Sequence, residues 1–419
     1  MSTRSLLLLF VAVLALGPLP VAARAADYVP GEVVVGHHDG SVSKVETQPG
    51  QSIGEAIERL RDHPKVAYAV PNLVAHAAAD WVPNDPYLDR QWNFIGTFGI
   101  GMPQAWSLAE AAGAPGGRGA VVAVVDSGVA YESRGAFKRD PDLHRGTFVH
   151  PWDFVGHDSH PNDRYGHGTH VAGTIAQATN NAFGVAGIAY GAKIMPLKVL
   201  DDFGEGDSLA IAKAIRYAAN HGADVINLSL EFDHRVVAGE IPEILSAIRY
   251  AHSRGVVIVA AAGNYKKPYL RRVAYPARAT DVIAVGATTR HGCRAEYSSY
   301  GADLDVVAPG GGADSKPSEP EEQLFCRPET SGSWIYQETF LGNSVAKFGL
   351  PRGYEGTSMA TPHVSAIAAL LIATRRLGEH PSPSLVEDRI EQTARDLGKP
   401  GYDSRYGWGL VSAAAALGP

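Results

Sequence analysis

A serine near the end of the chain has the surroundings of an activated nucleophile. In Gly356-Thr357-Ser358-Met359-Ala360-Thr361-Pro362, Ser358 stands between a glycine turn and a run of small residues. A free serine hydroxyl is a poor nucleophile, so it needs an adjacent base, a group that orients the base, and hydrogen-bond donors for the developing oxyanion. The motif therefore predicts acyl transfer through a covalent intermediate, if other segments supply these three partners.

The candidate base is a histidine that follows a glycine turn. His167 lies in Tyr165-Gly166-His167-Gly168-Thr169-His170-Val171-Ala172-Gly173. The glycines allow the chain to turn tightly before a helix that we expect to begin at about His167, and the small neighbours leave the imidazole accessible. His167 can therefore take the proton of the serine hydroxyl.

The orienting acid and the oxyanion donor each follow an apolar run. Residues 121–125 read as a fully buried parallel strand, and Asp126 adds a carboxylate at its carboxyl end. Residues 256–263 form a second such run, and Asn264 follows with an amide that can donate to an oxyanion. Ligand sites in open α/β sheets form at the carboxyl ends of strands, so both side chains are expected where a site can form.

These motifs resemble those of the subtilisin-like serine proteases, or subtilases. The family's order of acid, histidine and serine is matched by Asp126, His167 and Ser358, and its oxyanion asparagine is matched by Asn264. The similarity runs from about Trp81 to the end of the chain.

The resemblance implies a role for each of these residues. Ser358 would form the acyl-enzyme, His167 would act as general base and acid, and Asp126 would orient the imidazole. The Asn264 amide and the backbone N–H of Ser358 would hold the oxyanion. The second histidine of the motif, His170, would pack inside the protein.

Two other functions remain open from the sequence. His157, His160, His167 and His170 cluster, and the last two share a helix face, so a metal-dependent hydrolase is one alternative. That alternative lacks a His-Glu-x-x-His pattern and leaves the serine motif unexplained. The other is a catalytically silent subtilase-like binding protein, although no catalytic residue of the family is missing.

Strand and helix patterns alternate after Trp81. This alternation predicts that residues 80–419 form an α/β domain, with a doubly wound, mainly parallel sheet flanked by helices. Strands are expected near Val121, Ile194, Val225, Val256, Val282 and Leu304, and helices near His167, Ser208, Ile241 and Ser358.

Composition and the N-terminus predict a secreted protein. Hydrophobic residues at 45% and charged residues at 19% give ample material for a core. Arg4, the apolar run 6–16 and Ala23-Arg24-Ala25 form a signal-peptide pattern, assigned to residues 1–25. We expect an extracellular or periplasmic monomer that acts on proteins and peptides. The net charge of −7 and the lack of a basic patch predict no nucleic-acid partner, and no membrane partner is expected after signal cleavage.

Residues 26–79 predict a small α+β unit. Residues 31–35 and 66–70 read as strands, residues 52–61 as a helix, and Pro71 is expected to stop the second strand, which gives a βαβ-like order. This unit resembles the subtilase pro-segment, an intramolecular inhibitor and folding aid, but is shorter than is usual in the family.

The processing region of such a pro-segment is expected at 75–80, which has little to fix it in a fold. A permanent N-terminal subdomain is the alternative interpretation.

An insertion at residues 310–355, rich in Gly, Ser, Pro and Glu, separates the last expected strand from the serine motif. A solvated surface loop is the favoured interpretation, and a lining for the leaving-group side of the cleft is the alternative. Cys326 lies in the insertion and Cys293 precedes it, so a disulfide could tether the insertion, but the spacing does not decide this.

Structural calcium is the cofactor that the resemblance implies. The family's tight site is matched by Asp85, Asp142 and the loop 179–185, which offers the Asn181 side chain. The carbonyl ligands implied in that loop are those of Thr179, Phe183 and Val185.

A second calcium loop is suggested at residues 153–162. It keeps Asp153 and Asp158, but Gly156 stands where a further carboxylate would help.

Substrate recognition is expected at Ser229 and Leu230, where an extended peptide could add as a strand. The family commonly has glycine at the next position, but this chain has Glu231. Glu231 either narrows the pocket for the side chain before the scissile bond, favours a basic side chain there, or turns outward into solvent.

Overall fold

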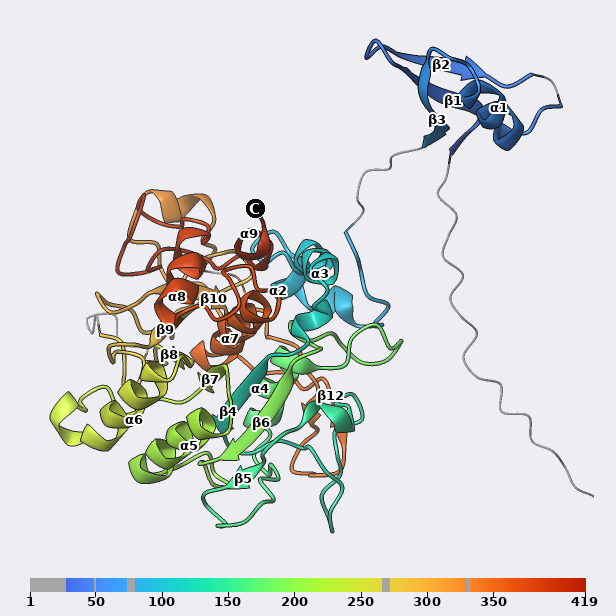
Figure 1. Ribbon diagram of the computed structural model, residues 1–419. Helices are drawn as coiled ribbons and strands as arrows, with labels where there is room; N and C mark the ends of the chain where they lie inside the picture. Colours follow the sequence, from blue (N-terminus) through green and yellow to red (C-terminus); the bar gives the residue numbers. More distant parts are fainter. Residues whose placement is uncertain (1–27, 49, 74–79, 266–271, 329, 331) are drawn as a thin grey trace, which may run out of the picture. The chain divides into compact units, whose positions relative to one another are not determined.

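The computed structural model describes residues 28–48, 50–73, 80–265, 272–328, 330 and 332–419. The chain forms two compact units, which divide between residues 79 and 80 (Figure 1). The predicted signal peptide and most of the predicted processing region lie outside the described residues.

The small unit is a three-stranded antiparallel sheet with one helix. Its elements are β1 (Tyr28–His37), β2 (Val42–Glu46), α1 (Ile53–Arg61) and β3 (Val66–Leu73). The strand order is β2-β1-β3, with both pairs antiparallel. The predicted helix is confirmed, and Ser52 caps it through a reciprocal pair of hydrogen bonds with Glu55.

Two details of the predicted βαβ-like order are wrong. The short and largely exposed β2 was missed because its pattern, with charged residues at alternate positions, buries almost nothing. The third strand also continues through Pro71 to Leu73. It can do so because β3 lies at the edge of the sheet, where a residue without an N–H is tolerated.

The large unit is built around a seven-stranded parallel sheet of order β10-β9-β8-β7-β4-β6-β5. Its strands are β4 (Val121–Asp126), β5 (Trp152–Asp153), β6 (Lys193–Lys198), β7 (Val225–Leu228), β8 (Val257–Ala261), β9 (Ile283–Thr288) and β10 (Val306–Pro309). A separate hairpin pairs β11 (Thr339–Phe340) with β12 (Phe348–Gly349).

Helices cover both faces of this sheet, which confirms the predicted doubly wound α/β fold. They are α2 (Trp92–Ile95), α3 (Met102–Ala111), α4 (His167–Ala176), α5 (Ser208–Asn220), α6 (Pro242–Ser253), α7 (Thr357–Ala373), α8 (Pro383–Gln392) and α9 (Ala413–Leu417). Apolar side chains of α5 and α6 pack on one face. Those of α3, α4, α7 and α8 pack on the other. The strands are apolar on both sides because both of their faces are buried.

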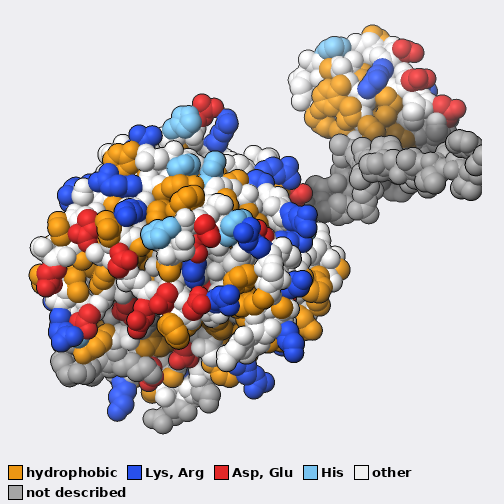
Figure 2. Space-filling view, turned by 90° about the horizontal axis from the view of Figure 1, so that it is seen from below, with side chains coloured by type: hydrophobic (Ala, Val, Ile, Leu, Met, Phe, Trp, Pro, Cys, Tyr) orange, Lys and Arg blue, Asp and Glu red, His pale blue; other side chains and the backbone are white. Residues whose placement is uncertain are grey.

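Acidic, basic and apolar side chains are interspersed on the face of the large unit that Figure 2 shows. Within the described ranges, none of the helices combines the length and the apolar character that crossing a bilayer requires.

Candidate active site

Asp126 is the last residue of β4, at the point where the order of the strands reverses. From β4 the chain builds β6 and β5 on one side of the sheet and then β7 to β10 on the other. The Asp126 side chain is fully buried, and its Oδ1 accepts a hydrogen bond from the Ser127 N–H at 2.7 Å. The carboxylate is therefore fixed at the switch point where such sheets form binding sites.

His167 is the first residue of α4, and its ring meets this carboxylate. Nδ1 lies 2.8 Å from Oδ1 and 3.0 Å from Oδ2 of Asp126. The close approach depends on Gly168, because a Cβ there would lie 2.1 Å from the carbonyl oxygen of Gly128. Since Nδ1 donates to the carboxylate, Nε2 is left free to accept a proton.

Two opposing influences set the pKa of His167. Desolvation is the largest and lowers the pKa, while the charge of Asp126 and its hydrogen bond raise it, with a smaller contribution from Asp163. The attractive interactions prevail, so the pKa is raised above its ordinary value. The site therefore stabilises the imidazolium form.

Asp163 is a buried acid that the sequence analysis missed. Its carboxylate accepts hydrogen bonds from the Ser127 hydroxyl and from the N–H groups of Tyr165, Gly166 and Thr169, as well as from the Thr169 hydroxyl. These contacts fix the turn that precedes His167. The available signal was an acid four residues before the histidine, which on its own is an ordinary turn residue.

Ser358 is the second residue of α7, where this helix meets the end of β7. Its hydroxyl donates to the carbonyl oxygen of Ser229 at 3.1 Å, and the Ser229 hydroxyl donates back to the Ser358 carbonyl at 2.8 Å. His167 and Ser358 line the same two cavities. To donate to His167, the Ser358 hydroxyl has to give up its hydrogen bond to the Ser229 carbonyl.

Asn264 follows β8 and contacts the start of α7. Its Oδ1 accepts from the N–H of Thr357 at 2.9 Å and from the Thr357 hydroxyl at 3.1 Å. These two bonds occupy the oxygen of the amide and leave Nδ2 as the donor. The role of oxyanion donor that the resemblance implies for Asn264 requires this nitrogen.

Glu231 is directed at Asn264 rather than away from the protein. Its two carboxylate oxygens accept from the Asn264 N–H at 3.1 and 3.0 Å, and Oε1 lies 3.4 Å from Nδ2. The carboxylate lies against Gly263, where a Cβ would approach Oε2 to 2.4 Å. Desolvation raises the pKa of Glu231, and the bonds from Asn264 oppose that rise.

Two cavities flank the serine and the histidine. The first, of about 560 Å³, is also lined by Ser229, Leu230 and Glu231. The second, of about 460 Å³, is lined by Asn264 and by residues 353–355 of the insertion. The candidates for substrate binding, and those for catalysis other than the buried Asp126, thus line these two cavities.

Residues 117–409 match the subtilase family, a span well over half of the chain. The chain belongs to this family. Thermitase from Thermoactinomyces vulgaris is 38% identical to it over 340 residues, which cover 80% of this chain and 99% of thermitase. The thermophilic serine proteinase of Bacillus sp. strain AK1 is 36% identical over 378 residues, covering 90% and 79%.

A protease from Pseudoalteromonas arctica is among the solved structures that resemble this subtilase. The TM-score is 0.64 at 31% identity, with 80% of this chain and 98% of that chain covered. The family and these relatives make the protein a serine-type endopeptidase.

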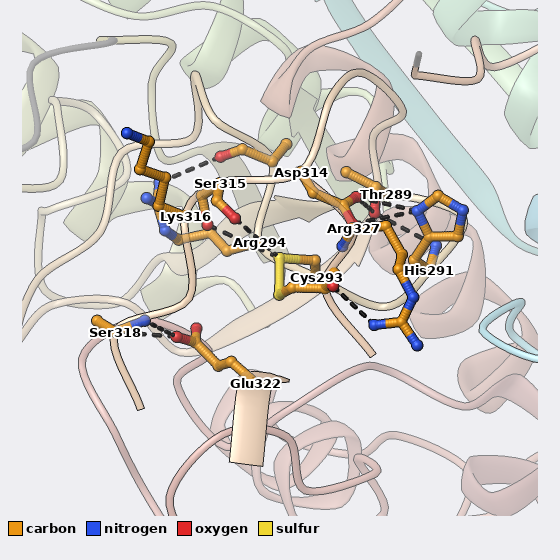
Figure 3. The surroundings of a disulfide bond; sticks show 12 residues. Thr289, His291, Cys293, Arg294, Asp314, Ser315, Lys316, Ser318, Glu322 and Arg327 are labelled. Atoms are coloured by element: carbon orange, nitrogen blue, oxygen red, sulfur yellow. Dashed lines mark hydrogen bonds and ion pairs between the residues drawn. A yellow bond between two sulfur atoms is a disulfide. The ribbon is translucent and has the colours of Figure 1, made fainter. Parts of the chain in front are cut away.

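The insertion at residues 310–355 packs on the rest of the large unit. The favoured prediction of a solvated surface loop is therefore wrong. Cys293 and Cys326 form a disulfide (Figure 3). Glu322 is fully buried and accepts from Arg405 Nε at 2.8 Å and from the Tyr406 hydroxyl at 2.9 Å.

The other end of the insertion contacts α4. His170 is fully buried, as the resemblance implied, and its Nε2 donates to the carbonyl of Ile335 at 3.0 Å. Its ring stacks on Tyr354 with the ring centres 4.2 Å apart. Desolvation lowers the pKa of His170 to about 3, so this histidine is neutral in the folded protein.

The residues predicted for the first calcium site lie together, but the Asn181 side chain turns its amide nitrogen to Asp142 and its oxygen to the Phe183 N–H. The Asp85 carboxylate accepts from the Asn180 N–H at 2.8 Å. The Asn181 amide donates to Asp142 Oδ1 at 2.6 Å, and the Val185 N–H lies 3.3 Å from Oδ2. Desolvation raises the pKa of Asp142 to about 7, and the charge of Asp85 adds to that effect. Two carboxylates that meet on one loop are a suitable oxygen set for calcium.

The remaining residues of that set shape the loop. The Thr179 hydroxyl accepts from the Gly187 N–H at 2.9 Å and donates to the Gln177 carbonyl at 3.0 Å. Phe183 donates its N–H to Asn181 Oδ1 at 3.0 Å. Hydrogen bonds of its own side chains thus hold the loop in shape, and its Gly184 carbonyl accepts from the Tyr87 N–H.

The second predicted calcium loop uses its carboxylates internally. Asp153 Oδ1 accepts from the N–H groups of Val155 and Gly156, and Asp158 Oδ1 accepts from that of His160. This loop stays a prediction without added support.

The four histidines proposed for a metal hydrolase do not form a ligand set. His160 contacts Glu132 at 2.9 Å, whereas His167 and His170 have the partners given above. Among the described residues, one group of three side chains of the metal-binding types has its ligand atoms close together. It comprises Asp305, Glu387 and Glu391. No histidine belongs to it.

Proposed function

We propose that this subtilase cleaves peptide bonds through an acyl-enzyme on Ser358. The observation that supports this most directly is the 2.8 Å contact between His167 Nδ1 and Asp126, beside a cleft that Ser358 also lines. This arrangement has the nucleophile, base and orienting acid of a serine protease.

The reaction then follows from the positions of the protons. His167 Nε2 takes the hydroxyl proton as Ser358 Oγ forms a bond to the peptide carbonyl carbon. His167 returns this proton to the leaving amine as the C–N bond breaks. Water, deprotonated in turn by His167, hydrolyses the acyl-enzyme, and Asp126 stabilises the imidazolium in both halves of the reaction.

The oxyanion is held by the Asn264 amide and by the backbone N–H of Ser358 at the positive end of α7. The two bonds from Thr357 to Asn264 Oδ1 support this role, because they orient Nδ2 before the substrate arrives.

The substrate is a protein or peptide that lies extended along Ser229 and Leu230. Glu231 belongs to the wall of the pocket for the side chain before the scissile bond. Its contact with the Asn264 N–H supports this position and disfavours the outward-turned alternative.

The enzyme is made as a precursor and exported. Residues 1–25 act as the signal peptide, and residues 26–79 act as an intramolecular inhibitor that the enzyme removes itself. The division of the chain between residues 79 and 80 supports a maturation bond in that neighbourhood.

Calcium at Asp85, Asp142 and the 179–185 loop stabilises the fold and takes no part in the chemistry. The loop lies at the end of α4, the helix that begins with His167, so the ion would support this helix from its far end.

The test is mass spectrometry of the purified secreted protein after exposure to a fluorophosphonate, with Ser358→Ala as the control. We expect labelling at Ser358 on a chain that starts near Asp80, and an unprocessed, unlabelled control. A folded, processed chain that does not label would instead support a catalytically silent binding protein.

A further inference from the structure

Four buried side-chain oxygens without a hydrogen-bond donor gather where the insertion packs on α4. Among the described residues these are Asp140 Oδ2, Gln177 Oε1, Gln337 Oε1 and Glu338 Oε2. Asp140, Gln177 and Gln337 are fully buried, and Glu338 is 5% exposed. Buried polar atoms nearly always have a partner, so a group of unsatisfied acceptors needs an explanation.

Contacts connect these side chains. Gln177 Nε2 lies 3.4 Å from Asp140 Oδ1. A Cβ on Gly173 would lie 2.4 Å from Gln177 Oε1 and 3.6 Å from Gln337 Oε1, so both amide oxygens face the same point on α4. Burial, and after it the charge of Glu338, raises the pKa of Asp140 well above its ordinary value.

Glu338 also lies beside the proposed calcium loop. A Cβ on Gly184 would lie 2.3 Å from Asp142 Oδ2 and 3.3 Å from Glu338 Oε2. Glu338 lines a cavity of about 540 Å³ with Phe183, Gly184 and Leu341, which gives an ion a route to the carboxylate.

The carboxyl groups at this place have no described cationic side chain in contact with them, although Arg90 lines the same cavity as Glu338. Asp85, Asp140, Asp142 and Glu338 form no ion pair with any described Lys, Arg or His. One calcium ion at the proposed first site would offset Asp85 and Asp142. Asp140 and Glu338 would still be two buried carboxyl groups without a cationic partner, and such groups are paired, protonated or bound to a metal.

We propose that Asp140 and Glu338 bind a second divalent cation, calcium, with the amide oxygens of Gln177 and Gln337 as neutral ligands. The proposal rests on the first calcium site proposed above and lies next to it. Two carboxylates match the charge of the ion, and all four ligands are the hard oxygens that calcium prefers. Because Gln337 and Glu338 come from the insertion, this ion fastens the insertion to α4 and to Asp140.

Counting bound ions tests the proposal. The full chain with Ser358→Ala, which cannot digest itself, is freed of metal and equilibrated with radioactive calcium by dialysis. We expect Glu338→Gln and Asp140→Asn each to bind one ion fewer per chain than the parent. Glu319→Gln, also in the insertion but paired with Lys399, serves as the matched control and should bind the full number.

The outcomes separate the two calcium proposals. If Glu338→Gln and Asp140→Asn bind as many ions as the parent, the second site is refuted. This result is also the one expected if Asp140 and Glu338 share a proton instead of binding an ion. If Asp85→Asn also changes nothing, the first site fails as well.

Misfolding is checked independently. Near-ultraviolet circular dichroism identifies a variant that does not fold, and Glu338→Asp, which keeps the charge, should keep the second ion. Calcium should also slow hydrogen exchange at residues 335–341 in the parent but not in Glu338→Gln. Equal exchange in the two chains would contradict the proposed fastening of the insertion.

Discussion

At the scale of single residues, hydrogen bonds orient the side chains of His167 and Asn264 in the candidate site. Asp126 occupies Nδ1 of His167, and Thr357 occupies the oxygen of Asn264. Nε2 of the histidine is left to accept a proton, and the amide nitrogen, whose other contact is a 3.4 Å hydrogen bond to Glu231, is left as the donor. These are the atoms that a serine protease needs for proton transfer and for oxyanion binding.

The raised pKa of His167 predicts the acid limb of the pH profile. The general base must be neutral, so kcat/KM should fall as pH decreases through this pKa. Since the pKa is above the ordinary value of about 6.5, half of the activity should already be lost at a pH above that value. A peptide nitroanilide assayed in saturating calcium would measure this. Activity that stays constant down to a pH of about 5.5, one unit below that ordinary value, would contradict it.

Asp126→Asn should remove the attraction that raises this pKa and leave the imidazole in the wrong tautomer. We expect kcat to fall about 10⁴-fold, the effect of the equivalent change in another serine protease. Titration of His167 by NMR in both proteins would show whether its pKa falls with the rate.

Asn264→Ala should lower kcat by about 10² to 10³-fold and change KM little, because the amide binds the oxyanion rather than the ground state. The figure comes from a related protease. Thr357→Ser keeps both bonds to Asn264 Oδ1 and should retain most of the activity. A loss of less than about tenfold in Asn264→Ala would argue against this role.

Glu231→Ala should shift the side-chain preference toward Phe and Leu and away from Lys and Arg. Both a wider pocket and the loss of a negative charge act in that direction. The measurement is kcat/KM for four peptides that differ only in the residue before the scissile bond. An unchanged order of preference would remove Glu231 from the pocket wall.

At the scale of elements, the sequence predicted what local patterns encode. The apolar runs before Asp126 and Asn264 gave β4 and β8, and the glycine motifs gave the starts of α4 and α7. The order of these elements was enough to assemble the cleft. Each catalytic candidate lies within a few residues of the apolar run or glycine motif that predicted its strand or helix.

The insertion could not be predicted in this way. Its segments read as polar, but their partners lie far away in the sequence, as with Glu322 and Arg405. Asp163 was missed for a related reason, since only the folded turn shows how many N–H groups converge on it. Long-range pairing of polar groups leaves no periodic signal.

The disulfide between Cys293 and Cys326 should stabilise the insertion against unfolding. Removing it in the double variant Cys293→Ser, Cys326→Ser should cost about 2–4 kcal/mol of unfolding free energy, because the unfolded chain gains freedom. The thermal midpoint should fall by several degrees, and proteases should cut more readily between residues 316 and 330. Reductant should shift the parent in the same direction and leave the double variant unchanged.

At the scale of the whole molecule, the core of the large unit and the region around its 179–185 loop differ in what stabilises them. The core on both faces of the sheet is apolar and continuous. The region around the 179–185 loop instead concentrates carboxylates. Its stability should therefore depend on the ions in solution.

Calcium removal should lower the thermal midpoint of the Ser358→Ala protein. An ion present at about 100 times its dissociation constant contributes about 2.7 kcal/mol per site. Asp85→Asn should lose the part of the shift that the first site provides, whereas magnesium should replace calcium poorly because its octahedral shell is stricter. Identical midpoints with calcium and with chelator would contradict the structural role of the ion.

Helix α7 links catalysis to folding. Every position from Met359 to Leu371 is buried, and the helix contacts β7, β8, β9 and β10. The proposed nucleophile stands on its first turn, so a molecule that loses its core also loses its nucleophile. A fluorophosphonate would therefore label only native molecules. The labelled fraction at each denaturant concentration would trace the unfolding curve without an optical probe.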